Sequence, residues 1–257
     1  MVDPRTSIID KRLKNVCNVI AVSGGKGGVG KSIIASTLAL LLAKNNNKVG
    51  LFDLDFTSPS TSLILGIKEA KPVEDKGIIP PKIHGLKYMS IVYYSGDYAV
   101  PLRGPDISNA LIELLAITRW GNLDYLILDT PPGISDATLD LIRLIKEIRF
   151  LIITTPSQLA FETVKKLTNL LKAQNIPIIG LIENMKIDNN QIIKGQTQKL
   201  NLNYLGQIPY DSQIENAIGN PASLLNTRLA QSIEQMTQTK RVKQRLAHAV
   251  EETRARY

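Results

Sequence analysis

The stretch SGGKGGVGKS, residues 23–32, constrains the fold more than any other part of this 257-residue sequence. Residues 25–32 match the pattern Gly-x-x-x-x-Gly-Lys-Ser/Thr in full. The β-branched run NVIAVS precedes the pattern at residues 18–23, and a run with helical spacing follows it at residues 32–46. A glycine-rich turn between a strand and a helix lets backbone N–H groups surround phosphate oxygens. The sequence therefore predicts a phosphate-binding loop in an α/β fold.

The loop suggests separate roles for its residues. Lys31 is expected to contact the β- and γ-phosphates of a nucleotide, and the Ser32 hydroxyl is expected to ligate Mg²⁺. The alternative is a glycine-rich turn without chemistry, but a complete motif in its strand–turn–helix context favours phosphate binding. The expected nucleotide-binding residues of this loop are Gly25, Lys26, Gly27, Gly28, Val29, Gly30, Lys31, Ser32 and Ile33.

The remaining apolar runs predict a parallel sheet. They show little alternation between apolar and polar residues, which is typical of strands buried on both faces. These runs lie at residues 48–55, 124–130, 150–156 and 176–185. Helical patterns separate several of them, and residues 66–96 predict a loop or hairpin that crosses to another strand. The repeated strand–helix–strand order predicts an α/β fold with a doubly wound, mostly parallel sheet flanked by helices.

The length favours a single large domain with additions at both ends. We expect an N-terminal segment at residues 1–14, a P-loop ATPase domain at residues 15–222 and a helical, basic C-terminal extension at residues 223–257. The formal net charge is +8, and residues 240–257 carry six basic side chains against two acidic ones. This basic tail leaves nucleic-acid binding open, beside a solvated or dimer-packing helix.

Membrane attachment is not expected. No apolar run approaches the roughly 20 residues of a membrane-spanning helix, and the N-terminus lacks the apolar stretch of a secretory signal. The apolar stripe of the tail is thin for an inserting helix, since it consists of Val242, Leu246, Ala249 and Val250. Cys17 is the only cysteine, which excludes an internal disulfide. We therefore expect a cytoplasmic protein.

Three carboxylates are placed to serve a metal ion and a water molecule. Asp129 ends the apolar run at residues 124–130, at the carboxyl edge of the expected sheet, where it can support Mg²⁺. Asp53 and Asp55 end another strand, and their spacing puts both on one side. One can support the metal while the other orients an attacking water. The alternative for either residue alone is a cap for the helix expected at residues 58–66.

These motifs together resemble those of the deviant Walker A ATPases, the family that includes ParA, MinD and Mrp. The matching stretches are KGGVGKS at residues 26–32, FDLD at 52–55, LDTPPG at 128–133 and IENM at 182–185. The sequence is most similar to the Mrp branch, whose members are scaffold and carrier ATPases linked to iron–sulfur cluster assembly. The likeness covers most of the chain.

The resemblance implies a homodimer that forms face to face around ATP. In this family the early lysine, here Lys26, crosses the interface and contacts the ATP of the partner subunit, as an arginine finger does. This role would explain why the loop carries two lysines; a solvated loop lysine is the alternative. The resemblance also implies that Asp55 positions the attacking water. Mg²⁺ would be served by Asp129, Ser32 and Asp53.

The resemblance also implies a pocket for adenine. The carboxamide of Asn184 is expected to contact the adenine edge, although Asn184 could instead merely terminate its strand. The stretch IPYD at residues 208–211 is expected to enclose the base through Pro209, Tyr210 and Asp211.

The sequence departs from the family pattern in its cysteines. Cluster carriers of the Mrp branch have a Cys-x-x-Cys pair shortly after the position of IENM, whereas residues 182–209 contain no cysteine. A [4Fe–4S] cluster shared by two subunits needs two thiolates from each. We therefore expect no iron–sulfur cluster. The switch would instead act on a protein partner, which the sequence does not identify. A redox reductase similar to the nitrogenase iron protein is set aside for the same reason.

The combined expectation is a Mg²⁺-dependent homodimeric switch of the Mrp type that binds ATP and hydrolyses it slowly to ADP and phosphate. The alternative is a ParA-like partitioning or positioning ATPase that binds DNA through the basic residues 240–245.

Overall fold

The computed structural model describes residues 3–95, 104–239, 242 and 246 of the chain. Its centre is an eight-stranded sheet with the order β10-β9-β8-β1-β7-β2-β6-β5. Neighbouring strands from β10 to β6 are parallel, and β5 is antiparallel to β6. The strands of this sheet are β1 (Val19–Gly24), β2 (Val49–Asp53), β5 (Lys82–Ile83), β6 (Leu86–Ser90), β7 (Tyr125–Asp129), β8 (Ile148–Thr154), β9 (Ile178–Lys186) and β10 (Tyr204–Pro209).

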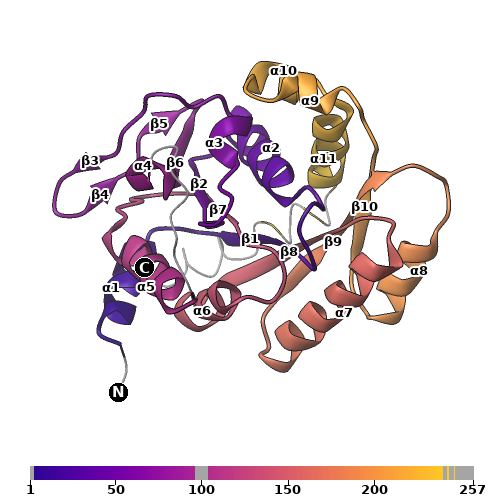
Figure 1. Ribbon diagram of the computed structural model, residues 1–257, viewed down its shortest axis with the longest axis horizontal. Helices are drawn as coiled ribbons and strands as arrows, with labels where there is room; N and C mark the ends of the chain where they lie inside the picture. Colours follow the sequence, from indigo (N-terminus) through magenta and orange to yellow (C-terminus); the bar gives the residue numbers. More distant parts are fainter. Residues whose placement is uncertain (1–2, 96–103, 240–241, 243–245, 247–257) are drawn as a thin grey trace.

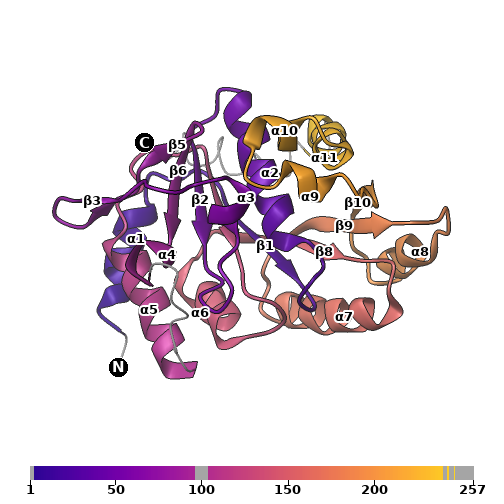
Figure 2. The same cartoon turned by 45° about the horizontal axis from the view of Figure 1, so that its top comes forward.

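Helices cover both faces of the sheet (Figures 1 and 2). One face carries α1 (Arg5–Leu13), α5 (Gly104–Ile117), α6 (Asp136–Leu144) and α7 (Gln158–Ala173). The other face carries α2 (Lys31–Lys44), α10 (Pro221–Leu225) and α11 (Arg228–Gln238). The shorter helices are α3 (Thr61–Ile64), α4 (Val92–Ser95), α8 (Ile192–Lys199) and α9 (Ile214–Ala217). Each face has its own buried apolar cluster, so the doubly wound α/β prediction is confirmed.

The apolar runs of the sequence form the inner strands, because helices remove both faces of the sheet from water. All residues of β1, β2 and the main part of β8 are buried. Helices α6 and α7 begin where the sequence offers a capping serine. The Ser135 hydroxyl accepts a hydrogen bond from the Thr138 amide, and the Ser157 hydroxyl accepts one from the Ala160 amide, both at 3.3 Å.

The stretch at residues 66–96 crosses to another strand, as predicted. It contains a small antiparallel hairpin, β3 (Val73–Glu74) with β4 (Ile78–Ile79), and then leads through β5 into β6. Strand β6 lies beside β2 and runs parallel to it. Helix α5, at residues 104–117, was not among the predicted elements.

The C-terminal helices α10 and α11 pack into the same body as the rest of the described chain. The expected boundary between residues 222 and 223 falls inside α10, and α11 packs against α2 and β10. Val242 and Leu246, from the supposed apolar stripe, are buried in the cluster that also contains Ile233. The basic residues of the tail, Lys240, Arg241, Lys243, Arg245, Arg254 and Arg256, lie outside the described residues. The domain bounds remain a prediction.

Within the described ranges, no helix has the length and apolar character needed to cross a membrane.

Candidate nucleotide-binding site

The glycine-rich loop joins β1 to α2 at the carboxyl edge of the sheet. Gly30 is the N-cap of α2 and has a φ of +86°, in the left-handed region that glycine adopts without strain. A Cβ at Gly30 would lie 2.3 Å from the Asn184 side-chain nitrogen, and one at Gly25 would lie 2.1 Å from the Thr163 hydroxyl oxygen. These glycines therefore allow both the turn and its close packing. The N-terminal amides of α2 face the loop and are suited to an anion.

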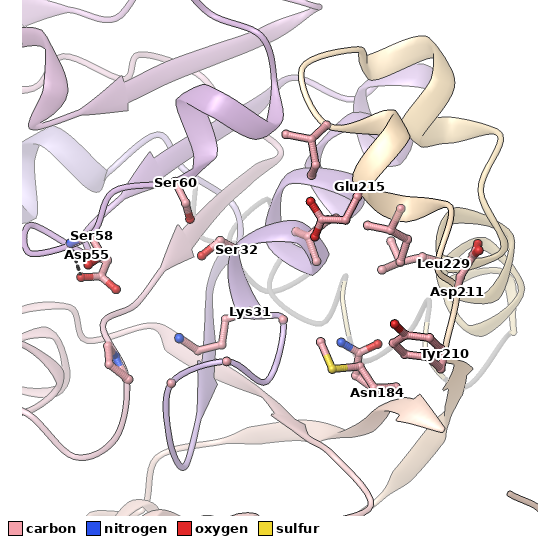
Figure 3. A pocket seen from close by; sticks show the side chains of 18 of the residues that line it. Lys31, Ser32, Asp55, Ser58, Ser60, Asn184, Tyr210, Asp211, Glu215 and Leu229 are labelled. Atoms are coloured by element: carbon pink, nitrogen blue, oxygen red, sulfur yellow. Dashed lines mark hydrogen bonds between the residues drawn. The ribbon is translucent and has the colours of Figure 1, made fainter. Parts of the chain in front are cut away.

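A cavity of about 620 Å³ opens beside this loop. This volume falls in the range of small-molecule and cofactor pockets. Figure 3 shows Lys31, Ser32 and Asp55 on one side of the cavity and Asn184, Tyr210 and Leu229 on the other. The predicted residues that line it are Gly27, Gly28, Gly30, Lys31, Ser32, Ile33, Asp55, Asn184, Pro209, Tyr210 and Asp211.

Five predicted site residues do not line the cavity: Gly25, Lys26, Val29, Asp53 and Asp129. Val29 is buried, and its carbonyl accepts a hydrogen bond from the Asn184 side chain at 2.9 Å. Lys26 is exposed on the loop and is not among the residues that line the cavity. A lysine in this position can reach another molecule.

Asp53 and Asp55 do not face the same space, which corrects the sequence-based expectation. Strand β2 ends at Asp53, so Asp55 lies beyond the strand and no longer follows its alternation. Both Asp53 oxygens accept hydrogen bonds, from the Asp55 amide at 3.1 Å and from the Thr61 amide and hydroxyl at 3.1 and 2.6 Å. The carboxylate thus holds the start of α3, as the capping alternative proposed. A metal role for Asp53 remains a prediction.

Asp55 is the aspartate of this pair that lines the cavity. Its Oδ1 accepts hydrogen bonds from the Thr57 hydroxyl at 2.7 Å and the Ser58 amide at 3.2 Å. This local turn fixes the carboxylate without placing it at a helix terminus, because α3 begins only at Thr61. A carboxylate held in this way beside a phosphate site is suited to orienting water.

Asp129 is fully buried at the end of β7, in register with Asp53 on the neighbouring strand β2. Among the described residues, neither of its carboxylate oxygens has a well-formed hydrogen bond. Burial, with the nearby Asp53 charge, raises the pKa of Asp129 to about 8, while the Ser32 side chain and the Lys31 charge lower it. Burial also raises the pKa of Asp53 to about 6, against the hydrogen bonds from Thr61.

These features fit a divalent cation at this edge of the sheet. The two buried oxygens of Asp129, which lack a well-formed hydrogen bond, would gain a positive charge as partner, and this would restore the ionised carboxylate. In the described part of the chain, no group of three His, Cys, Asp or Glu side chains is placed to hold a metal ion. A cation here would therefore need other oxygens, and Mg²⁺ commonly takes these from one or two carboxylates, phosphates and water.

Asn184 lies within β9, which continues to Lys186, so the strand-terminating alternative is wrong. The next residue, Met185, has a φ of +58° and also lines the cavity. Neither the left-handed backbone of Met185 nor the buried ion pair that flanks it was predicted, because a single sequence gives no signal for a strand bulge at a methionine.

A comparison with protein families shows to which family the chain belongs. Residues 15–247 match the ParA family model described as NUBPL iron-transfer P-loop NTPase. The chain belongs to this family. It is 40% identical over 179 residues to an iron-sulfur cluster carrier protein of Pseudomonas fragi, covering 68% of this chain and 62% of that relative. It is 36% identical over 218 residues to the iron-sulfur cluster transfer protein NUBPL of Dictyostelium discoideum, covering 79% and 68%.

The family fold is also found among solved structures. The nucleotide-binding protein of Archaeoglobus fulgidus in complex with ADP aligns with a TM-score of 0.75 and 28% identity, covering 88% of this chain and 95% of that one. MinD of Pyrococcus horikoshii, complexed with Mg-ADP, aligns with a TM-score of 0.64 and 19% identity, covering 85% and 93%. The second likeness supports the fold alone.

The expectation of no iron–sulfur cluster is contradicted by the names of these relatives. That expectation counted the cysteines of one chain. A cluster that passes between proteins also takes ligands from the molecule that gives or receives it, so a missing Cys-x-x-Cys pair does not exclude cluster handling. The chain spans 62% of the Pseudomonas relative and 49% of an Aquifex aeolicus relative, so the activities of the whole relatives are not transferred to it directly.

Proposed function

We propose that this protein is an ATP-dependent switch that binds and slowly hydrolyses ATP with Mg²⁺ and acts in iron–sulfur cluster transfer. The observation that carries the nucleotide part is the cavity between the glycine-rich loop and β9–β10, with Lys31 and Ser32 on one side and Asn184 and Tyr210 on the other. The arrangement offers phosphate ligands on one side and residues that can enclose a base on the other side of the same cavity.

In the proposed reaction the chain positions groups and neutralises charge. Amides of the loop and of the first turn of α2 hold the phosphates, with the Lys31 amine at the β- and γ-phosphates. Asp55 orients water for in-line attack, which needs no covalent enzyme intermediate. Bound Mg²⁺ would be held by Ser32 and Asp129, with Asp53 behind them, and would supply positive charge at the phosphates.

The base side would select adenine. Asn184 can present its amide to the base edge once a nucleotide competes for the bond to the Val29 carbonyl. Pro209, Tyr210 and Asp211 would enclose the ring, and Leu229 from α11 adds an apolar surface.

The second subunit would complete the site. Lys26 is exposed and lies outside the cavity of its own subunit, which is the position expected of a cation that enters a neighbouring site. A lysine placed at developing phosphate charge accelerates hydrolysis as an arginine finger does. Hydrolysis would then depend on a homodimer formed face to face around ATP.

The cargo is proposed from the relatives, which are named iron-sulfur cluster carrier and transfer proteins. A protein that donates or accepts the cluster is then the expected partner. The alternative, a ParA-like ATPase that binds DNA through residues 240–245, gains no support from these relatives. Those basic residues also lie outside the described part of the chain.

The first test is nucleotide binding by titration calorimetry with Mg-ATP. Lys31→Ala should abolish binding, because the loop would lose the cation that neutralises the β- and γ-phosphates. Lys199→Ala, an exposed lysine of α8, is the matched control and should bind as the unaltered protein does. Equal ATP affinity in Lys31→Ala and the control would exclude this cavity as the nucleotide site.

The cluster part of the proposal has its own readout on the same protein. This protein is incubated anaerobically with a cluster-loaded donor protein and an apo-acceptor, and absorption spectroscopy should show that the acceptor gains its cluster faster than without this protein. Transfer no faster than with a denatured control would contradict cluster transfer and leave the ATP site intact.

A further inference from the structure

A buried ion pair spans the part of β9 that borders the cavity. The Lys186 amine lies 2.7 Å from a Glu183 carboxylate oxygen, with side chains 3% and 1% exposed. The other Glu183 oxygen accepts a hydrogen bond from the Tyr204 hydroxyl at 2.7 Å, and the Lys186 amine donates to the Asn190 side chain at 3.2 Å. The amine also lies 3.6 Å from Asp188. Both charges are therefore well partnered.

The pair encloses an irregular piece of strand. Asn184 and Met185 lie between its two members, and Met185 has the left-handed φ of +58°. The pairing of β9 with β10 shifts register at the same place, between Gln207 and Pro209. A non-glycine residue in this backbone region is strained and persists only where its surroundings hold it. The ion pair joins the residues on either side of the bulge, and so holds it.

The bulge connects the two ends of the cavity. On one side the Asn184 side chain donates to the carbonyl of Val29 in the phosphate loop at 2.9 Å. On the other side the Lys186 carbonyl accepts a hydrogen bond from the Tyr210 amide at 2.8 Å. A change in the bulge would thus move both the amide expected at the base edge and the residue expected to enclose the base.

Stability alone does not account for this ion pair. Taking two charges out of water is unfavourable, and a buried pair often contributes no more to stability than apolar residues of the same volume. The best-supported use of a buried polar pair is to select one register or geometry. The geometry points to Glu183 and Lys186 as positioning residues that set the base selectivity of the cavity. This inference rests on the proposed nucleotide function.

The test compares three ligands in three states of the pair. Affinities for ATP, GTP and inorganic tripolyphosphate are measured, with Mg²⁺, in Glu183→Gln, Lys186→Met and the double variant Glu183→Leu/Lys186→Met. ATP affinity should fall roughly tenfold or more, and the ATP-to-GTP ratio should move toward one, because the base contacts lose their geometry. Tripolyphosphate affinity should stay within about twofold, since the phosphate loop remains in place.

Matched controls come from an exposed pair with the same spacing. Glu162 and Lys165 on α7 lie 3.2 Å apart with side chains 62% and 47% exposed, so Glu162→Gln and Lys165→Met should leave all three affinities unchanged. Each single variant leaves one buried charge without its partner and can lose stability. The double variant removes both charges, and we expect it to fold. Retained tripolyphosphate binding verifies the fold of each variant.

Two results would overturn the inference. One is an unchanged ATP-to-GTP ratio in the double variant, and the other is an equal loss of ATP and tripolyphosphate binding. If the unaltered protein selects ATP but the variants do so equally, the positioning role is wrong and the ATP site stands. If the unaltered protein binds no ATP, the proposed function itself is wrong.

Discussion

At the residue scale, the two aspartates at the ends of β2 and β7 are buried carboxyls whose pKa values are raised. Asp53 and Asp129 are register partners on the neighbouring parallel strands β2 and β7, and both are fully buried. Asp53 accepts hydrogen bonds from Thr61 at the start of α3, whereas Asp129 has no well-formed hydrogen-bond partner among the described residues. Burial raises the pKa of both carboxyls, that of Asp129 to about 8, so near neutral pH the protein without ligand holds a proton on Asp129 that a bound cation would displace.

Substituting Asp129 tests this description through the pH dependence of stability. The ordinary aspartate pKa is 3.8, and burial raises that of Asp129 to about 8, so between these values the folded protein binds more protons than the unfolded chain. The free energy of unfolding therefore falls as pH rises through this window. Asn cannot ionise, so Asp129→Asn should gain stability over the unaltered protein at pH 8.5 but not at pH 4.5.

The measurement is thermal unfolding in a chelator without nucleotide. The gain in Tm should be at least about 3 °C larger at the higher pH, equivalent to roughly 1 kcal/mol. Asp106→Asn, at an exposed position in the first turn of α5, is the control and should show no such difference. A pH-independent gain would mean that Asp129 is ionised in the folded protein throughout.

The sequence indicated where the glycine-rich loop lies, because the turn requires glycine, but it misplaced a side chain whose direction depends on where a strand ends. The glycine-rich loop and Lys31 were predictable because phosphate binding needs glycines and a cation at fixed spacing. Asp53 and Asp55 were expected on one side because the strand was expected to run through both. The strand ends at Asp53, and the chain then turns. Because the strand ends two residues before Asp55, the Asp55 carboxylate no longer follows the alternation of the strand.

At the element scale, helix α11 contributes to the buried core, although the sequence predicted it as part of a helical, basic extension. Helix α11 packs against α2 and β10 and contributes Leu229, Ile233 and Met236 to the buried cluster on that face. Its Leu229 also lines the cavity. The helix that follows the phosphate loop is thus supported by a helix near the other end of the chain, about 200 residues later in the sequence.

Truncating one side chain of α11 measures that support. Ile233→Ala should lower the free energy of unfolding by about 2–5 kcal/mol, because it leaves a cavity in the cluster under α2. Gln235→Ala, on the exposed side of the same helix, should change it by less than about 0.5 kcal/mol. Urea denaturation measures both. Similar small effects would mean that α11 does not support the fold of the rest of the chain.

The sheet was predictable from sequence because its inner strands are uniform apolar runs between helical patterns. Strands β1, β2, β7, β8 and β9 all fall within or beside the predicted runs. The short pieces β3, β4 and β5 gave no such signal, since two residues cannot show periodicity. The apolar residues Leu229, Ile233 and Met236 of α11 recur at helical spacing, which indicates a helix with one apolar side but does not identify what that side covers. Only the fold reveals the surface that this apolar side covers.

At the scale of the whole molecule, the account rests on a second copy of the chain. The cavity has a phosphate side, a base side and a water-orienting carboxylate from one subunit, while Lys26 stays exposed outside it. If Lys26 acts in the site of the partner subunit, as proposed, ATP is hydrolysed only when two subunits meet, and the nucleotide state then reports dimerisation. Cluster transfer could then be coupled to the assembly and release of the dimer.

The most direct test mixes two inactive variants. Lys26→Ala and Asp55→Ala should each hydrolyse ATP slower by a factor on the order of 10³, since each lacks one part of every site. In a heterodimer the Lys26→Ala subunit keeps its Asp55 and receives Lys26 from the Asp55→Ala subunit, which completes one site of the two. An equimolar mixture with ATP should therefore recover about a quarter of the unaltered rate. A mixture as inactive as its components, or a Lys26→Ala protein that hydrolyses ATP normally by itself, would contradict the account.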